Sequence, residues 1–396
     1  MARVLVTGLG AVSALGLSVE DNLSALRCGR SGIVSKPKGI ATALELPVGE
    51  VSASRGDFCG MLGLARDSKV TKTALMAALA VREALCDSGA DASSAALVLG
   101  TSVGGMDISG DFYEEYRKDP SSGDETLMLT HDCGASAEFV AGFLGMKGFT
   151  TTVSTACSSA GNAIMLGARM IKSGMADVVV AGGSDALSRF TMNGFNSLRI
   201  LSSSPCRPFD AMRDGLNLGE GAGFIVLESE KSAASRGKEA YCAVAGWANV
   251  NEAFHQTASS DDGEGAFMAM REAMRTAGLS ASDIDFVNTH GTATVGNDMS
   301  EGAALKRIFG GEVPPFNSFK GFTGHTLAAS EGIEAVFCAL GISGGMILPS
   351  AGFSETDPLI GLAPVTEFRS GVRLRNILSN SFGFGGNDSS LIFSAL

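Results

Sequence analysis

The sequence predicts an α/β protein made of two comparable halves that meet near residue 235. Short apolar runs typical of strands alternate with longer runs that have the periodicity or the small residues of helices, and the alternation continues through all 396 residues. The most charged window, residues 228–238, interrupts it and indicates an exposed connector. The expected units are therefore residues 1–235 and 236–396. No strong sequence identity relates them, so the duplication is inferred from the pattern of elements alone.

In the first half, the clearest helix start lies at Ser18, which can cap the following run while Glu20 and Asp21 occupy the first helical turn. Residues 107–126 are polar and contain two tyrosines and a proline, which indicates a surface excursion. Strands are expected at 3–7, 96–101, 149–154, 177–181 and 224–227, and helices at 18–26, 70–85, 135–144 and 159–172.

The second half resumes the alternation after the connector. The most membrane-like stretch of the chain, residues 335–353, has no charged side chain, but Gly344, Gly345 and Pro349 interrupt it, which favours a buried helix followed by a turn. Residues 1–10 are apolar without a basic segment and predict a first strand, not a signal peptide, so we expect a soluble cytoplasmic protein. Strands are expected at 242–247, 284–288, 376–380 and 390–393, and helices at 266–277, 299–309 and 326–340.

Composition excludes several classes of function. The net charge is −12 and no run of Lys or Arg exceeds two residues, so nucleic acid is not expected as the main ligand. The eight cysteines are irregularly spaced without a Cys-x-x-Cys pair, which argues against a zinc site and a disulfide framework. Only 18% of residues are charged and 45% are hydrophobic, which favours a large core or a buried subunit interface.

A glycine-containing turn after the first strand is close to a dinucleotide-binding pattern, with Gly8 and Gly10 in place. Ser13 stands where a third glycine is needed, and the helix begins only at Ser18. No dinucleotide cofactor is therefore expected.

Residues 153–162 (VSTACSSAGN) lead from a predicted strand through a tight turn into a helix. This places Cys157 at the helix start, where free backbone N–H groups and the helix dipole stabilise a thiolate. The small residues around it would admit a substrate. A buried structural cysteine in the same surroundings is an equally acceptable interpretation of this segment alone.

Two of the four histidines, His290 and His325, lie in loops rich in glycine and threonine. Both follow strand-like segments, where α/β proteins place active sites. Together with a cysteine at a helix start they favour a cysteine nucleophile with imidazole partners. A cysteine hydrolase needs one histidine and an Asn or Asp to orient it, whereas this chain offers two similar histidine loops and Lys320.

Four further motifs follow one another along nearly the whole chain: residues 4–8 (VLVTG), 207–210 with 213–215 (RPFD, RDG), 219–223 (GEGAG) and 380–387 (NSFGFGGN). With them the chain resembles the β-ketoacyl–acyl-carrier-protein synthases, condensing enzymes of the thiolase superfamily. The resemblance implies a thiolase-like fold, in which two similar α/β halves form a five-layered αβαβα arrangement. The first half would carry the nucleophilic cysteine, and the second the two histidines and the lysine.

The resemblance also implies an acyltransferase reaction, a decarboxylative Claisen condensation. An acyl chain on Cys157 and a malonyl group on acyl carrier protein would give a β-ketoacyl carrier and CO2. His290 and His325 would stay neutral and donate hydrogen bonds to the malonyl thioester carbonyl, which stabilises the enolate formed as CO2 leaves. The backbone N–H groups of Cys157 and Phe384 would form the oxyanion hole. The carrier's phosphopantetheine holds the substrates, and no metal or other cofactor is expected.

Other positions match residues that support this chemistry in the family. Lys320 matches a lysine with a structural and electrostatic role, and Glu301 matches the usual partner of that lysine. Thr292 and Thr294 match positions that contact the pantetheine arm. The acyl pocket is expected at Val103, Phe195 and Phe384, and Phe384 also matches a gating phenylalanine. For Phe195, ordinary core packing is the alternative interpretation.

The resemblance extends to partners. The family is dimeric, so a homodimer is expected, with a heterodimer with a related subunit as the alternative. Arg66, Lys69 and Lys72 fall at helical spacing in a stretch that resembles the family's carrier-docking helix. Three solvated charges on an exposed face would look the same.

The chain departs from the family pattern at two places. Asn387-Asp388 stands where Thr-Asn is usual, and Val295 where Pro is usual. These departures keep open a ketosynthase of a polyketide, aryl polyene or flexirubin-type pigment pathway beside fatty-acid biosynthesis. A chain-length-factor-like partner subunit usually lacks the nucleophilic cysteine that this chain retains. A degradative thiolase needs a second catalytic cysteine near its C-terminus, and none follows Cys338.

Overall fold

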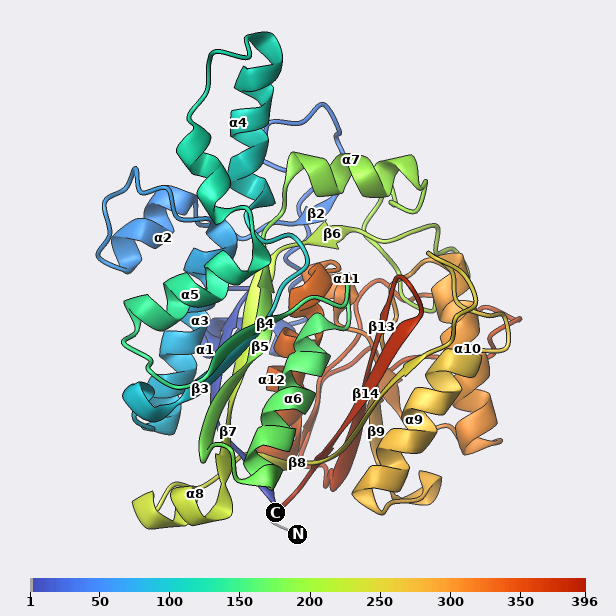
Figure 1. The fold of residues 1–396 in the computed structure, drawn as a ribbon. Helices are drawn as coiled ribbons and strands as arrows, with labels where there is room; N and C mark the ends of the chain where they lie inside the picture. Colours follow the sequence, from blue (N-terminus) through green and yellow to red (C-terminus); the bar gives the residue numbers. More distant parts are fainter. Residues whose placement is uncertain (1–2) are drawn as a thin grey trace.

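The computed structural model describes residues 3–396, which fold into alternating layers of helices and strands (Figure 1). The main sheet has ten strands in the order β10-β9-β13-β14-β8-β1-β7-β5-β3-β4. Its strands are β1 (Val4–Val12), β3 (Ala96–Gly100), β4 (Thr150–Val153), β5 (Val178–Asp185), β7 (Gly221–Ser229), β8 (Cys242–Asn251), β9 (Phe286–Asn288), β10 (Phe316–Asn317), β13 (Asn376–Gly383) and β14 (Asn387–Ser394).

Each half of this sheet repeats one topology. In both halves the strands lie in the order third, second, fourth, fifth and first along the chain. In both, the first three of these are parallel and the last two add antiparallel. Among the described strands of the main sheet, the two halves are joined by the pairing of β1 with β8, through Leu5–Ala243 and Val6–Cys242. The duplicated layout of elements is thus present in the strand order, while a domain boundary at residue 235 stays a prediction.

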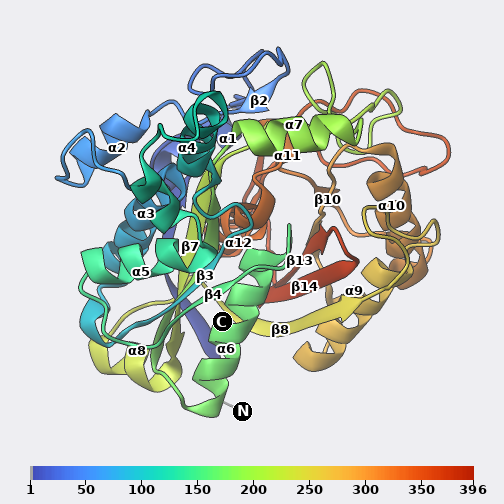
Figure 2. The same cartoon turned by 45° about the horizontal axis from the view of Figure 1, so that its top comes forward.

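Helices complete five layers, as the fold class predicts. Helix α3 (Lys72–Ser88) covers the outer face of the first half, and α9 (Glu264–Ala277) with α10 (Val295–Phe309) covers that of the second. Helices α6 (Ser159–Ser173) and α12 (Ser330–Gly344) contact strands of both halves and form the middle layer (Figures 1 and 2). The largest core cluster accordingly combines both halves, with Val4, Ile333 and Ile377 among its members.

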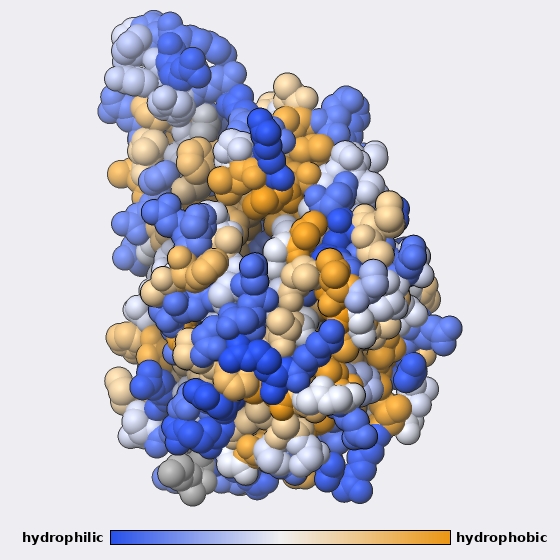
Figure 3. Space-filling model, turned by 90° about the vertical axis from the view of Figure 1, so that its right-hand side faces the viewer, coloured by the Kyte–Doolittle hydropathy of each residue, from blue (hydrophilic) through white to orange (hydrophobic). Residues whose placement is uncertain are grey.

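The apolar stretch near the C-terminus lies in this middle layer. Residues 327–344 are long and apolar enough to cross a membrane by length and composition, but 83% of them are buried in the protein, as in a core helix. Helix α12 ends at Gly345 in the left-handed conformation, which confirms the expected buried helix and turn. On the face covered by α9 and α10, hydrophilic and hydrophobic residues are interspersed (Figure 3).

Several shorter elements differ from the sequence-based expectation. The excursion at 107–126 is helix α4 (Met106–Lys118), on which Phe112 stacks against Tyr116 at 5.8 Å, followed by a turn of 3-10 helix. The connector at 228–238 is the end of β7 and helix α8 (Glu230–Arg236), because buried Glu228 accepts hydrogen bonds from Thr7 and Arg236. Helix α7 (Arg189–Ser197), which lies beside α4 at the top of the molecule, was not expected (Figure 2). The other elements are α1 (Val19–Arg27), α2 (Arg55–Met61), α5 (Cys133–Phe143), α11 (Lys320–Thr323) and the short strands β2 (Val48–Gly49), β6 (Leu218–Gly219), β11 (Met346–Ile347) and β12 (Arg369–Ser370).

Helix α12 lies directly on β7 because two glycines face each other. A Cβ on Gly223 would lie 2.1 Å from the backbone nitrogen of Ile333, and one on Gly332 would lie 2.3 Å from the carbonyl oxygen of Gly223. Backbone atoms cannot turn aside as a flexible side chain can. The middle layer therefore keeps its distance from the sheet only with glycine at both positions.

We expect Gly223→Ala to lower the free energy of unfolding by about 3 kcal/mol, because α12 must move off the sheet. The measurement is the melting temperature by calorimetry. Gly142→Ala is the matched control, since a Cβ there meets nothing within 4 Å in helix α5, and it should leave the melting temperature unchanged or higher. Equal melting temperatures for Gly223→Ala and the wild type would contradict this packing.

Candidate active site

Cys157 lies in the turn between β4 and α6, with its side chain buried. The turn is made by Ala156, which adopts a left-handed backbone with φ of 53°, and Ser158 stands before the first residue of the helix. This is the strand, turn and helix that the sequence predicts for this segment. The sulfur is thereby held at the amino end of a long helix in the middle layer.

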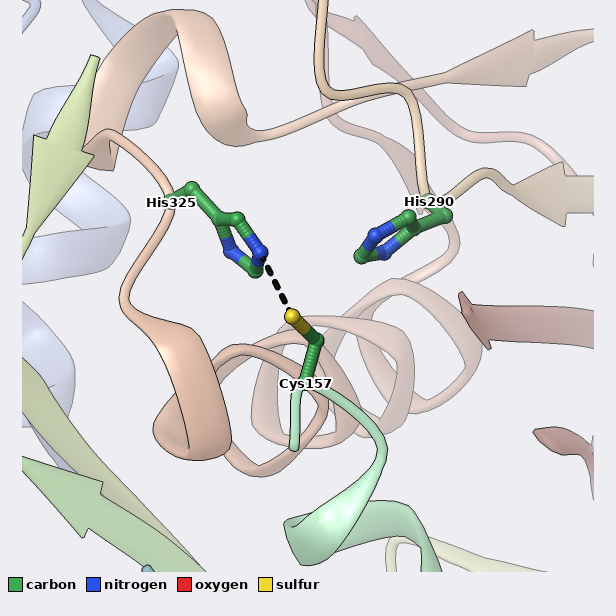
Figure 4. A group of neighbouring side chains, drawn as sticks. All are labelled: Cys157, His290 and His325. Atoms are coloured by element: carbon green, nitrogen blue, oxygen red, sulfur yellow. Dashed lines mark hydrogen bonds between the residues drawn. The ribbon is translucent and has the colours of Figure 1, made fainter. Parts of the chain in front are cut away.

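The two histidine loops of the second half meet this cysteine. Nε2 of His325 lies 3.0 Å from Sγ of Cys157, and the two imidazole rings are 5.3 Å apart at 84° (Figure 4). His290 follows β9, and His325 follows α11, where its backbone hydrogen bonds to residues 217 and 219 of the first half. Three such atoms within 4.8 Å of one another also satisfy the geometry of a metal site, so the absence of a metal stays a prediction.

Burial decides the protonation of these groups. Burial raises the pKa of Cys157 to about 11, although the charge of Lys320 and the backbone N–H of Phe384 oppose it. Burial therefore favours the thiol in the free enzyme, against the helix start, which favours the thiolate. Burial first, and then the charge of Lys320, hold the pKa of both His290 and His325 well below the ordinary value, so both rings are neutral.

Lys320 forms an ion pair with a residue that sequence reasoning missed. Its Nζ lies 2.8 Å from Oε1 of Glu334 on α12, and both side chains are almost fully buried. Asn288 donates a hydrogen bond to the other oxygen of Glu334 at 3.3 Å. Glu334 could have been noticed as an acidic residue inside the apolar helix, but nothing in the pattern pairs it with this lysine.

Glu301 does not contact Lys320, so the expectation that it is the lysine's partner is wrong. Its carboxylate instead accepts hydrogen bonds from the backbone N–H groups of His290 and Gly291, each at 2.9 Å, and from the amide of Asn380. Burial raises the pKa of Glu301 to about 7. Glu301 thus fixes the backbone of the His290 loop.

The second nitrogen of each histidine has different surroundings. Nδ1 of His325 lies 3.0 Å from the hydroxyl of Ser330, a residue that sequence reasoning also missed. Nδ1 of His290 is buried without a hydrogen-bond partner. The hydroxyl of Ser330 can donate or accept, so it can serve either tautomer of His325.

A cavity of about 410 Å³ opens above Cys157 and both histidines. Phe195 and Phe384 line it and stack on each other with ring centroids 5.7 Å apart. Thr292 and Thr294 also line it, and their hydroxyls are 2.9 Å apart. Val103 packs in the same hydrophobic cluster as Phe195 but is not part of the cavity wall, so its role in the acyl pocket stays a prediction.

The three basic residues expected to dock the carrier do not share one surface. Arg66 and Lys69 are exposed, precede α3 in a loop, and pair with Asp57 and Asp124. Lys72 begins α3, and its Nζ pairs with the carboxylate of buried Glu220. The prediction of one exposed helical face is wrong, because Lys72 neutralises a charge inside the protein. Docking by Arg66 and Lys69 stays a prediction.

A five-layered fold with a buried cysteine between two neutral imidazoles defines a condensing acyltransferase, and comparison with known proteins agrees. The beta-ketoacyl synthase family models match residues 1–233 (N-terminal domain) and 241–354 (C-terminal domain). The chain therefore belongs to the beta-ketoacyl synthase family.

Relatives match over nearly the full length. The 3-oxoacyl-[acyl-carrier-protein] synthase 2 of Staphylococcus aureus is 32% identical over 416 residues, covering 99% of this chain and 98% of that protein. The structure of the ishigamide ketosynthase/chain length factor superposes with a TM-score of 0.94 at 31% identity, over 100% of this chain and 99% of that chain. The structure AntDE:AntF, a type II PKS acyl-carrier protein in complex with its ketosynthase, superposes with a TM-score of 0.91 at 27% identity, over 100% of both chains.

Glu331 gives a pH-dependent prediction. Burial and the neighbouring Glu334 raise the pKa of Glu331 to about 8, although the side chain of Ser379 opposes this shift. The unfolded chain ionises this group near its ordinary pKa of 4.5, so the contribution of Glu331 to stability falls as the pH rises from about 4.5 to 8 and then levels. Glu331→Gln removes this dependence.

We therefore expect Glu331→Gln to gain stability relative to the wild type on going from pH 5 to pH 8, measured as the difference in melting temperature at each pH. Glu20→Gln, at an exposed glutamate, is the control and should show the same difference at both pH values. A Glu331→Gln difference that does not change with pH would show that this carboxyl is not held protonated.

Proposed function

We propose that this protein is a β-ketoacyl-ACP synthase that condenses an acyl thioester on Cys157 with a malonyl thioester on acyl carrier protein. The observation that carries the proposal is the contact of the Cys157 thiol with Nε2 of His325 at 3.0 Å, beside the second neutral imidazole of His290. The products are a β-ketoacyl carrier and CO2. The phosphopantetheine of the carrier is the only prosthetic group that the reaction uses.

In the loading step, the sulfur of Cys157 attacks the thioester carbonyl of the acyl carrier. A new C–S bond to Cys157 forms and the C–S bond to the pantetheine breaks. The thiol proton of Cys157 is transferred to the leaving pantetheine sulfur. Nε2 of His325, in contact with the thiol, is placed to pass this proton. The backbone N–H groups of Cys157 and Phe384, which both act to lower the pKa of the thiol, would stabilise the oxyanion.

In the condensation step, the bond between the malonyl carboxylate and its α-carbon breaks and CO2 leaves. The electron pair passes into an enolate, whose oxygen accepts hydrogen bonds from neutral His290 and His325. The α-carbon then attacks the thioester on Cys157, and the sulfur leaves as a thiolate that takes up a proton. The charge of Lys320 supports this role because it disfavours protonation of both rings.

The roles of Cys157 and His325 can be separated by mutation. We expect Cys157→Ala to abolish the mass gain of the intact protein on incubation with acyl carriers. His325→Ala should still load acyl chains, while CO2 release from malonyl carrier falls by about 100-fold or more. Mass spectrometry and labelled-CO2 release are the measurements. Wild-type condensation by His325→Ala would refute the enolate role.

An acidic carrier protein is the partner that this site requires. The AntDE:AntF structure is of an acyl-carrier protein in complex with its ketosynthase, and the ishigamide structure is of a ketosynthase/chain length factor. By analogy we propose that this chain docks a carrier near Arg66 and Lys69 and acts as a dimer, either with itself or with a related subunit. A soluble carrier fits a cytoplasmic location.

We expect Lys69→Glu to raise KM for acyl carrier by about fivefold or more and to leave KM for acyl-CoA unchanged, because only the carrier presents an acidic surface. Arg275→Glu, an exposed charge reversal on the outer helix α9, is the control. An equal rise for both substrates would show that Lys69 affects the active site and not docking.

Fatty-acid biosynthesis is the main proposal for the pathway, and a polyketide or aryl polyene pigment pathway is the alternative. The alternative is favoured by the closeness of the ishigamide ketosynthase structure. A purely structural chain-length-factor role is disfavoured because Cys157, His290, His325 and Lys320 are all present. A panel of acyl carriers that differ in chain length and unsaturation separates the two pathways by the chain that loads fastest.

A further inference from the structure

Asn387, one of the departures from the family pattern, occupies a central place in the hydrogen bonding around Cys157. It is the first residue of β14 and follows the turn that carries Phe384. Its Oδ1 accepts hydrogen bonds from the hydroxyl of Ser158 at 2.8 Å, from the amide of Asn162 at 3.0 Å and from the amide of Asn249 at 2.7 Å.

Two of these donors flank the nucleophile. Ser158 is the residue after Cys157, and Asn162 lies in the first turn of α6. The amide of Asn162 also donates to the hydroxyl of Thr155 at 2.8 Å. The hydroxyl oxygen of Ser158 also lies 2.8 Å from the carbonyl oxygen of Thr155, so its single proton is shared between Thr155 and Asn387. Asn387 is thus linked to the chain on both sides of Cys157.

Both segments that it joins need such support. Ala156 holds a left-handed backbone that is unfavourable for a residue with a Cβ, and such conformations persist only where the surroundings determine them. Beyond Phe384, Gly385 and Gly386 both have positive φ, a conformation that glycine adopts without strain but does not by itself fix. The hydroxyl of Ser381 bonds the carbonyl of Cys157 at 2.9 Å from the strand before Phe384. Asn387 supplies the corresponding link from β14, the strand that follows Phe384.

We propose that Asn387 is a positioning residue that holds the backbone N–H groups of Cys157 and Phe384 in register as one oxyanion hole. The inference rests on the proposed function. The two donors come from different halves of the protein, and a displacement of about 1 Å between them costs about 100-fold in rate. Asn387 bonds directly across this junction.

The proposal predicts a split between the two chemical steps. The oxyanion hole acts on the thioester carbonyl at Cys157, during loading and during attack by the enolate. Decarboxylation of the malonyl group uses His290 and His325, which Asn387 does not contact. A general loosening of the fold would slow both steps, whereas a misplaced oxyanion hole slows the first alone.

The test measures, for each variant, the rate of acyl loading by intact mass and the rate of CO2 release from malonyl carrier without an acyl donor. We expect Asn387→Ala to slow loading about 10-fold to 100-fold and to leave CO2 release within about twofold of the wild type. Asn387→Thr keeps an acceptor oxygen and should restore loading to within about threefold. Ser394→Ala, at the other end of β14, where the hydroxyl donates to Oδ1 of Asn376, is the matched control and should change neither rate by more than about twofold.

Two outcomes would overturn the proposal. One is an equal loss of acyl loading and of CO2 release in Asn387→Ala, and the other is acyl loading by Asn387→Ala within twofold of the wild type. If Asn387→Ala does not fold, Ser158→Ala removes the same link from the nucleophile side and must show the same split. A wild-type protein that neither loads acyl chains nor releases CO2 would instead refute the proposed function.

Discussion

The site depends on one buried ion pair, Lys320 with Glu334. Two charges this far from water are costly unless they neutralise each other at close range, and here they lie 2.8 Å apart. The cation that results acts on everything around it: it disfavours protonation of His290 and His325, and it partly offsets the effect of burial on the pKa of Cys157. A neutral imidazole can donate a hydrogen bond to an enolate oxygen, and the charge of Lys320 supports the neutral form that burial favours.

The second constraint is that no half of the chain carries a complete site. Cys157 lies at the start of a middle-layer helix that belongs to the first half, and both histidines come from the second. The backbone of His325 is in turn held by residues 217 and 219 of the first half. The two halves meet through the paired glycines at Gly223 and Gly332 and through the shared core. Assembly of the layers is therefore what brings nucleophile and donors together.

The local sequence pattern was enough to predict many of the helices and strands and part of the site. Ser18 caps helix α1 as predicted. The strand, turn and helix around Cys157 could also be predicted, because consecutive residues determine them. The pairing of charged side chains that lie far apart in the sequence could not be predicted from the local pattern. Glu334 and not Glu301 neutralises Lys320, and Lys72 turns inward to Glu220, because partner choice depends on which elements the topology brings together. The thiol of Cys157 shows the same limit: a helix start favours the thiolate, but the depth of burial, which only the fold determines, outweighs it.

The most direct test of this account is a single turnover of acyl-loaded enzyme with malonyl carrier labelled in the carboxylate carbon. The account predicts that one labelled CO2 is released and one β-ketoacyl carrier is formed for each acyl group lost from Cys157. Loss of the acyl group by hydrolysis with no labelled CO2, or release of CO2 with the acyl group still on the cysteine, would contradict the joint action of the thiol and the two neutral imidazoles.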